Sequence, residues 1–340
     1  MQLHSLMPYL LYQFKNEHEL IKAIEELSLK FTQKRERLSD YLKDERLTSA
    51  YTAFYLTTNM PKLEAVFQWM PGEWLEKLKN CTLIDLGAGP GTFSLAFREW
   101  LGHSTEVIQI ETSTLMREQA KKIWDGLYPN EPLIQAINSR INPHKEKFLL
   151  LGHSANEMGA ELVSRYINEI EPDHILFIEP GTKTFFPEML KIRSLLLSQN
   201  YNVLYPCPNA SDCPLKGSDE DWCHQFIQIK QDPELERLSQ MAKKDRSLLP
   251  LIVHAYSKKI KSKNAEVRLI RVLPETKFSF EWQTCELNKA EHYQIMKRGL
   301  DKPSLNALEK TLAGAPVFVE VVEKMMENRK RVKIKLTAKS

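Results

Sequence analysis

The chain has no apolar run long enough to cross a bilayer, and this absence sets the first limit on its function. A membrane-spanning helix needs about 20 consecutive apolar residues, and no such run occurs among the 340 residues. The N-terminal stretch MQLHSLMPYLLYQF has no basic n-region and no small-residue cleavage site, and it lacks the Arg-rich, acid-poor look of a transit peptide. The sequence therefore predicts a protein of a bacterial-type cytoplasm, without a membrane partner.

The net charge is also small, and the cysteines are few. The net charge is +3, which is too small to indicate a nucleic-acid partner by itself, and there are five cysteines. In a reducing cytoplasm, clustered cysteines more often bind metal than form disulfides. No internal repeat or low-complexity block is evident. With 42% hydrophobic and 27% charged residues, the chain can bury the core of two domains or of one large elaborated domain.

The pattern of apolar residues changes near Cys81. Before it, EHELIKAIEELSLKFTQKRERLSDYLKDERL and AYTAFYLTTNMPKLEAVFQWM have helical spacing, the second broken near Pro61, and we assign no chemistry to either. After it, the strand-length runs CTLIDL, EVIQIE, KFLLLG and HILFIE alternate with segments long enough for helices. This alternation predicts a βαβ array, with a parallel sheet and helices on both faces.

A glycine-rich turn follows the first of these strands. In LIDLGAGPGTFSLAF, Asp85 ends the strand, and Gly87, Gly89 and Gly91 lie in the turn before a helix. Glycines allow close approach of a ligand, and the helix N-terminus favours polar or anionic groups. The dinucleotide fingerprint needs a glycine where the chain has Thr92. The G-x-G-x-G spacing instead resembles motif I of the class I S-adenosylmethionine (SAM)-dependent methyltransferases.

Two further acids end strands of the predicted sheet. Glu111 closes EVIQIE, where a carboxylate can accept hydrogen bonds from both ribose hydroxyls, and in the methyltransferase family this is the acid of motif II. Binding of NAD remains the alternative. Glu179 ends HILFIE, which we take as the fourth strand, and Pro180 follows it; both should face the reactive end of the cofactor. Glu179 is the candidate catalytic residue or a cap on the cofactor site, although a plain Pro-Gly turn is an alternative.

Four cysteines form a candidate metal-binding set. Cys207, Cys213 and Cys223 are spaced C-x5-C-x9-C among turn-forming residues, and Cys285 follows downstream, whereas Cys81 reads as a small buried residue. Four thiolates suit tetrahedral zinc or a [4Fe-4S] cluster. The sequence has no C-x2-4-C knuckle typical of zinc ribbons, and the irregular spacing favours the cluster. The C-x3-C-x2-C spacing of radical SAM enzymes is also missing.

The cysteine segments resemble a known family. CPNASDCPL, DWCHQF and a lone cysteine after RLIRVLP are similar to the methyltransferase-like small-ribosomal-subunit assembly factors of mitochondria and bacteria, which carry a [4Fe-4S] cluster. The likeness covers about residues 48 to 290 and includes IEPGT. It implies Cys207, Cys213, Cys223 and Cys285 as ligands. The family's Pro-Pro-basic-Gly-His run before the fourth cysteine is missing here, so His224 is the alternative to Cys285.

Two basic runs bear on the partner. Such runs attract phosphate backbones, although a solvated face is the alternative. Together with the resemblance, they imply ribosomal RNA as the partner. The residues are Lys258, Lys259, Lys261 and Lys263 in the first run, and Arg329, Lys330, Arg331, Lys333 and Lys335 in the second.

The resemblance and the motifs together predict an α/β, Rossmann-like class I methyltransferase fold in a monomer. We expect an N-terminal helical region at 1–78, a SAM-binding core at 79–205, a cysteine-rich iron-sulfur module with the remaining core strands at 206–290, and a C-terminal helical segment with a basic tail at 291–340. The expected function is methylation of small-subunit ribosomal RNA or assistance in ribosome assembly. The alternatives are a non-catalytic SAM-binding checkpoint factor and a zinc-containing, RNA-binding methyltransferase-like protein.

Overall fold

The computed structural model describes residues 2–33, 43–138, 145–242, 248–261, 267–317, 319–326 and 328–334. The chain divides into two compact units. The first comprises Met1–Glu157, Arg165–Ile178 and Gln228–Leu249, and the second comprises Met158–Ser164, Glu179–Ile227 and Pro250–Ser340. No helix within the described ranges is both long and apolar enough to cross a membrane.

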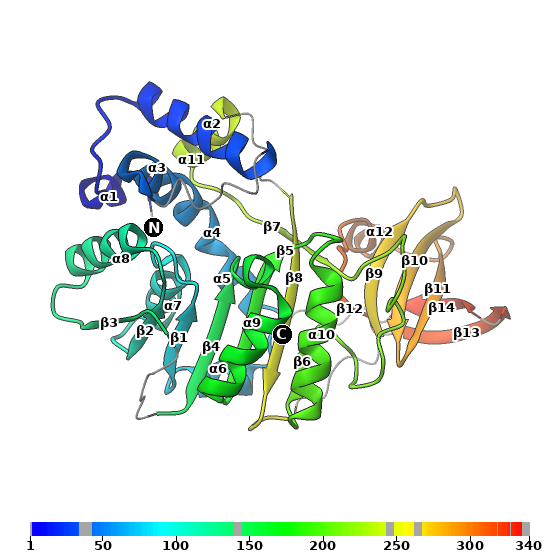
Figure 1. The fold of residues 1–340 in the computed structure, drawn as a ribbon. Helices are drawn as coiled ribbons and strands as arrows, with labels where there is room; N and C mark the ends of the chain where they lie inside the picture. Colours follow the sequence, from blue (N-terminus) through cyan, green and yellow to red (C-terminus); the bar gives the residue numbers. More distant parts are fainter. Residues whose placement is uncertain are drawn as a thin grey trace. The chain divides into compact units, whose positions relative to one another are not determined.

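The first unit is built on a parallel sheet with the strand order β3-β2-β1-β4-β5 (Figure 1). Every pair in this run is parallel, and the order reverses direction at β1, between β2 and β4. In open α/β sheets, ligands bind at the carboxyl ends of the strands beside such a reversal. The strands are β1 (Thr82–Leu86), β2 (Val107–Ile110), β3 (Leu133–Ala136), β4 (Lys147–Gly152) and β5 (His174–Pro180). The last two residues of β5 belong to the second unit.

Helices α7 (Thr92–Leu101), α8 (Thr114–Leu127) and α9 (Ala155–Ile170) follow β1, β2 and β4. β1 is buried over its whole length and lies between two neighbours, which explains its continuous apolar run. This strand-helix alternation confirms the predicted α/β fold class, with a parallel, Rossmann-like sheet.

The N-terminal residues of the first unit are helical, as the sequence predicts. Gln119 of α8 anchors the start of the chain, because its side-chain oxygen accepts from the Leu11 N–H at 3.0 Å and its amide donates to the Tyr9 carbonyl at 2.9 Å. Pro61 begins a new helix shortly after another short helix ends at Asn59, which accounts for the predicted break. The elements are α1 (Leu3–Leu6), the 3₁₀ turn Met7–Tyr9, α2 (Glu17–Gln33), α3 (Glu45–Tyr51), the π-helix Thr52–Leu56, α4 (Thr57–Asn59), α5 (Pro61–Phe67), α6 (Gly72–Leu78) and α11 (Pro233–Met241).

The second unit contains helix α10 (Phe186–Ser198), a group of strands around β8, and a second sheet. β6 (Asn202–Tyr205) runs antiparallel to β8 (Leu248–Ser257), whose residues from Pro250 onward belong to this unit, and β7 (Gln225–Gln228) also pairs with β8. The second sheet has the order β12-β9-β10-β11-β14-β13. Its elements are β9 (Val267–Leu273), β10 (Ser279–Glu286), β11 (Lys289–Met296), β12 (Pro316–Val317), β13 (Val319–Met326) and β14 (Arg329–Ile334), with helix α12 (Lys302–Glu309) after β11.

Alternating residues of this second sheet form a core of their own. Phe280, Trp282, Tyr293 and Ile295 are each no more than 3% exposed and belong to one hydrophobic cluster. Because successive side chains of a strand point to opposite faces, the residues between them form the other face. That face is polar, and on it Glu281 accepts a hydrogen bond from the His292 ring at 2.5 Å.

The structure differs from the sequence predictions in two places. Strand β3 was not predicted, because LIQA is short and partly exposed, so that it lacks the apolar run of a buried strand. HILFIE is therefore the fifth strand and not the fourth. The C-terminal region 291–340, expected to be a helical segment with a basic tail, has α12, most of β11, and β12, β13 and β14 among its described residues. The β-branched run around β13 favours extended backbone.

Candidate functional site

The glycine-rich turn after β1 has the backbone that its sequence predicts. Gly87, Gly89 and Gly91 all have positive φ angles, and α7 begins directly after Gly91. Asp85 is 1% exposed, and its Oδ2 accepts from the N–H of Ser94 at 3.0 Å and from the Ser94 hydroxyl at 2.7 Å. Burial raises the pKa of Asp85 to about 6. The Asp85 carboxylate therefore fixes the first turn of α7 against the end of β1.

Glu111 lies at the edge of the same turn. Its Oε2 accepts from the N–H of Gly89 at 2.9 Å, and its Oε1 accepts from the N–H of Ser113 at 2.7 Å. A carboxylate offers about four lone-pair sites, so further donors can still bind it. The chain thus brings a half-buried acid from the end of β2 onto the glycine turn of β1, as a nucleoside-binding cradle requires.

The loop after β4 contacts the same turn, and sequence reasoning missed it. The Ser154 hydroxyl donates to the carbonyl of Leu86 at 2.6 Å. His153 adopts a φ of 61°, an uncommon conformation for a residue with a side chain, and its Nε2 lies 2.8 Å from Nζ of the buried Lys62. Because β3 is an additional strand, β4 is the fourth strand of the chain. The loop at His153 therefore follows the fourth strand, and the segment after HILFIE follows the fifth.

Glu179 and Pro180 end β5, within the second unit. Glu179 is fully buried, and the following Gly181 donates its N–H to the carbonyl of Pro250 at 3.0 Å. A Cβ on Gly181 would lie 2.7 Å from the backbone of Pro250, so this turn has a packing reason for its glycine. The roles of Glu179 in catalysis and of both residues in cofactor binding stay predictions.

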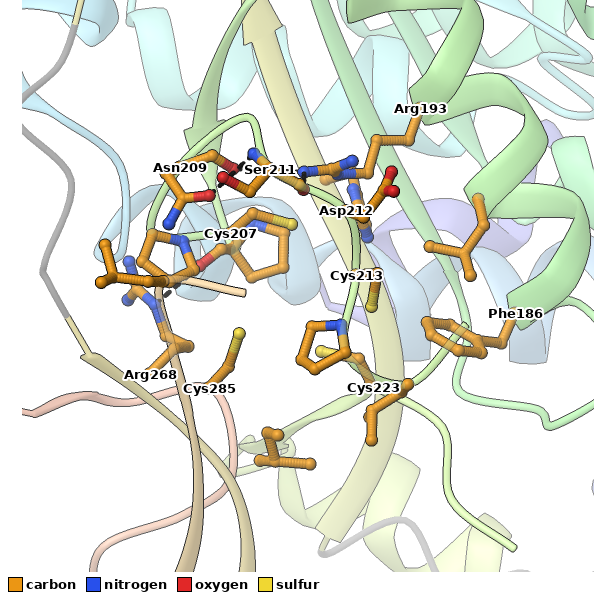
Figure 2. Close-up of a pocket in the computed structure, with 18 residues that line it drawn as sticks. Phe186, Arg193, Cys207, Asn209, Ser211, Asp212, Cys213, Cys223, Arg268 and Cys285 are labelled. Atoms are coloured by element: carbon orange, nitrogen blue, oxygen red, sulfur yellow. Dashed lines mark hydrogen bonds between the residues drawn. The ribbon is translucent and has the colours of Figure 1, made fainter. Parts of the chain in front are cut away.

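The four candidate cysteines line one pocket of the second unit. Figure 2 shows the thiols of Cys207, Cys213, Cys223 and Cys285 around a common space. The first three lie on the segment between β6 and β7, and Cys285 lies on β10. His224 does not line the pocket, since its ring stacks on Trp222 and its Nδ1 lies 3.1 Å from the Trp222 carbonyl.

Burial favours the protonated form of three of these thiols, those of Cys213, Cys223 and Cys285. It raises the pKa values of Cys213 and Cys223, and it raises that of Cys285 to about 12. The neighbouring thiols add to each of these shifts, which places the groups within electrostatic reach of one another. A metal that bound here as a thiolate complex would displace the protons.

Two arginines border the pocket, and sequence reasoning missed both. Arg193 of α10 is 4% exposed and Arg268 of β9 is 6% exposed, and both line the pocket (Figure 2). No carboxylate of the described residues forms an ion pair with either guanidinium. Each was detectable as an arginine inside a mainly apolar stretch, IRSLLL and VRLI. Such a buried charge is expensive unless an anion compensates it.

The closest group of metal-type side chains lies elsewhere, in the first unit. Among the described residues, one group of three metal-type side chains has its candidate ligand atoms all within 4.8 Å of one another. It consists of Cys81, Glu146 and His174. The indole N–H of Trp74 donates to Nδ1 of His174 at 3.2 Å, so in the neutral ring Nε2 carries the proton and has no lone pair for a metal. Cys81 is 1% exposed, as predicted for a small buried residue.

The comparisons with known proteins give the family. Over residues 46–296, the chain matches the family model described as mitochondrial small ribosomal subunit Rsm22. The match covers more than half of the chain and includes both the glycine turn and the four cysteines. The chain belongs to the Rsm22 family, which confirms the predicted resemblance to a small-ribosomal-subunit family. The [4Fe-4S] cluster that this resemblance implied stays a prediction. None of the curated proteins matches it.

Several solved methyltransferase structures have similar regions, at low similarity. Magnesium protoporphyrin IX methyltransferase from Synechocystis PCC 6803, with bound SAM, is 11% identical with a TM-score of 0.39, over 72% of this chain and 100% of that one. A SAM-dependent methyltransferase from Aquifex aeolicus is 13% identical with a TM-score of 0.32, over 45% and 93%. The ribosomal protein L11 methylase from Lactobacillus delbrueckii subsp. bulgaricus is 13% identical with a TM-score of 0.33, over 57% and 78%.

Proposed function

We propose that the protein binds S-adenosylmethionine and a [4Fe-4S] cluster and acts on the small ribosomal subunit, as an RNA methyltransferase or an assembly factor. The partner follows from membership of a family described as a small-ribosomal-subunit protein. The observation that carries the cluster is the pocket that four thiols share with two buried, carboxylate-free guanidinium groups. The basic runs support an RNA partner only in part, since Arg329, Lys330 and Arg331 each lie within ion-pair distance of a glutamate.

The glycine turn and Glu111 support the SAM site. Two backbone N–H groups hold the Glu111 carboxylate at the turn, where it can accept from the ribose hydroxyls of a nucleoside cofactor. Asp85 orients the turn through Ser94. When bound, SAM supplies an electrophilic methyl group. Calorimetry with SAM and with NAD separates the two cofactors, and binding of NAD alone would contradict the proposal.

The spacing of the thiols favours a cluster over a single zinc ion. Tetrahedral zinc with Zn–S bonds of about 2.3 Å brings its sulfurs to roughly 3.8 Å from one another. No three of the four thiols, all of them in the described part of the chain, come within 4.8 Å of one another. In a cubane cluster each cysteine binds a different iron, so the sulfurs lie farther apart. We assign the ligands to Cys207, Cys213, Cys223 and Cys285.

Four cysteine ligands leave no iron open to a substrate, which indicates a structural role for the cluster. Three of them lie on one connection and the fourth lies on β10, so a bound cluster would tie this connection to the second sheet and stabilise both. The test is anaerobic reconstitution of the full chain with iron and sulfide. A brown product that absorbs at about 400 nm is expected, and failure to take up iron would contradict the cluster.

A non-catalytic factor is the second candidate, because neither cofactor-site acid of the first unit is placed as a general base. The Asp85 carboxylate accepts from Ser94, and the Glu111 carboxylate accepts from Gly89 and Ser113. Transfer of a labelled methyl group from SAM to small-subunit RNA decides between the two. Transfer by the wild type that a Glu111→Ala variant loses would contradict the non-catalytic candidate, and SAM binding without transfer would support it.

A further inference from the structure

The two buried arginines make complementary contacts with the segment that carries the first two cysteines. Arg193 donates from Nη2 to the carbonyls of Asn209 at 3.2 Å and Ser211 at 2.7 Å, both between Cys207 and Cys213. Its Nε is buried and has no hydrogen-bond partner among the described residues. The guanidinium is therefore fixed by backbone oxygens on one side and keeps an unused donor.

Arg268 holds the other side of Cys207. Its Nε donates to the carbonyl of Pro206 at 2.8 Å, and its Nη1 donates to the carbonyl of Gly314 at 3.3 Å. The guanidinium also lies over the ring of Tyr205, 4.8 Å from the ring centroid. Neutral carbonyls and an aromatic face orient the cation, but they do not neutralise its charge.

The electrostatic neighbours of both arginines are the pocket thiols. Burial lowers the pKa of Arg268, and the charges of Tyr205, Cys207, Cys223 and Cys285 oppose that shift. Burial also lowers the pKa of Arg193, but the nearby Cys207 and other ionisable groups outweigh it, so the net shift is upward. Each guanidinium thus has pocket thiols and a tyrosine as its main ionisable neighbours.

The charge of a bound cluster matches that of the two arginines. An oxidised cubane core carries two positive charges, so with four thiolates the complex has two net negative charges. Two guanidinium ions balance the two charges of the oxidised complex, and addition of one electron to the core leaves one negative charge uncompensated by the pair. The one carboxylate among the described residues that line the pocket, that of Asp212, is exposed. Removal of either arginine would leave more negative charge of the cluster uncompensated in both oxidation states. The uncompensated charge would be greater in the reduced state, so reduction would become less favourable.

We propose that Arg193 and Arg268 are a charge-compensating pair that retains the four-thiolate cluster and raises its reduction potential. The inference rests on the proposed cluster but goes beyond it, because it assigns a role to two residues that bind no iron. Both are positioning residues for the cluster, since they act through charge and through the backbone that carries its ligands.

The test is redox titration, followed by electron paramagnetic resonance, of the full chain with its cluster reconstituted. In Arg268→Met and Arg193→Met, the ratio of reduced to oxidised cluster at a fixed potential should fall at least tenfold, which is about 59 mV for a one-electron couple. Arg268→Lys and Arg193→Lys, which keep the charge, should recover most of the loss. The matched control is Arg298→Met, which removes the same charge from an exposed position.

Each outcome decides the inference. Methionine variants that hold a full cluster with the reduction potential of the Arg298→Met control would overturn it. If the methionine variants do not retain iron, the lysine variants decide, because the pair acts by charge only if lysine restores the cluster. Loss of iron from the lysine variants as well would show that the guanidinium contacts matter instead of the charge. A wild-type chain that takes up no cluster would contradict the proposed function, and with it the basis for this pair.

Discussion

Replacement of Asp85 by asparagine should change how the stability of the protein depends on pH. The carboxyl group is 1% exposed, and burial raises its pKa from the ordinary 3.8 to about 6. Above that pH the fold carries an ionised, desolvated group. Between about pH 4 and pH 6 the folded protein binds a proton that the unfolded chain does not, so this group makes the free energy of unfolding increase as the pH falls.

The size of the effect follows from the two pKa values. The difference between 3.8 and about 6 corresponds to about 3 kcal/mol, at about 1.4 kcal/mol for each pH unit. Asparagine cannot ionise, but its carbonyl can still accept from Ser94. Relative to wild type, Asp85→Asn should therefore gain stability as the pH rises from about 4 to 7.

Urea unfolding of the wild type and of Asp85→Asn at a series of pH values measures this difference. The other titrating groups are common to both proteins and cancel in the comparison. The expected result is a difference in unfolding free energy that grows by about 3 kcal/mol between about pH 4 and pH 7. Parallel pH profiles would refute the argument that the fold carries a buried, desolvated carboxylate at this position.

Two further substitutions test the cofactor turn and the turn after β5. Glu111→Gln removes the charge that two backbone N–H groups bind, and because such hydrogen bonds contribute about 1.5–3 kcal/mol, the Kd for SAM measured by calorimetry should rise at least about tenfold. The exposed Glu118→Gln is the control, and equal SAM affinity of wild type and Glu111→Gln would count against the cradle. Gly181→Ala places a Cβ 2.7 Å from the Pro250 backbone and should lower the urea midpoint by the equivalent of about 1–3 kcal/mol. Gly72→Ala, which meets no atom within 4 Å, should leave the midpoint unchanged or raise it slightly, because alanine lowers the entropy of the unfolded chain. An equal loss of stability in the two alanine variants would exclude the packing argument.

The cofactor turn could be predicted from the sequence because its signal is local. Gly87, Gly89 and Gly91 all need positive φ within five residues, and the strand before them and the helix after them have clear apolar patterns. The loop at His153 could not be predicted, since its significance depends on counting the strands, and β3 has no buried run to mark it. A contact such as Ser154 to Leu86 joins residues 68 positions apart and leaves no local trace.

The cysteine pocket was predictable in part. The spacing of Cys207, Cys213 and Cys223 indicated a shared site, and family resemblance added Cys285, which lies on a strand of a different sheet. The arginines Arg193 and Arg268 have no spacing relation to the cysteines, because α10 and β9 reach the pocket only through the tertiary fold. The available signal was an arginine within a mainly apolar stretch. Such a signal indicates a buried charge but does not indicate which groups lie beside it.

Metal analysis of two variants tests the central claim most directly. Iron, acid-labile sulfide and zinc are counted in anaerobically purified wild type, Cys285→Ser and His224→Ala. Because Cys285 lines the pocket and His224 does not, we expect about four irons per chain in the wild type and in His224→Ala, and fewer in Cys285→Ser. A colourless wild type with one zinc per chain, or a cluster lost in His224→Ala and kept in Cys285→Ser, would contradict the account.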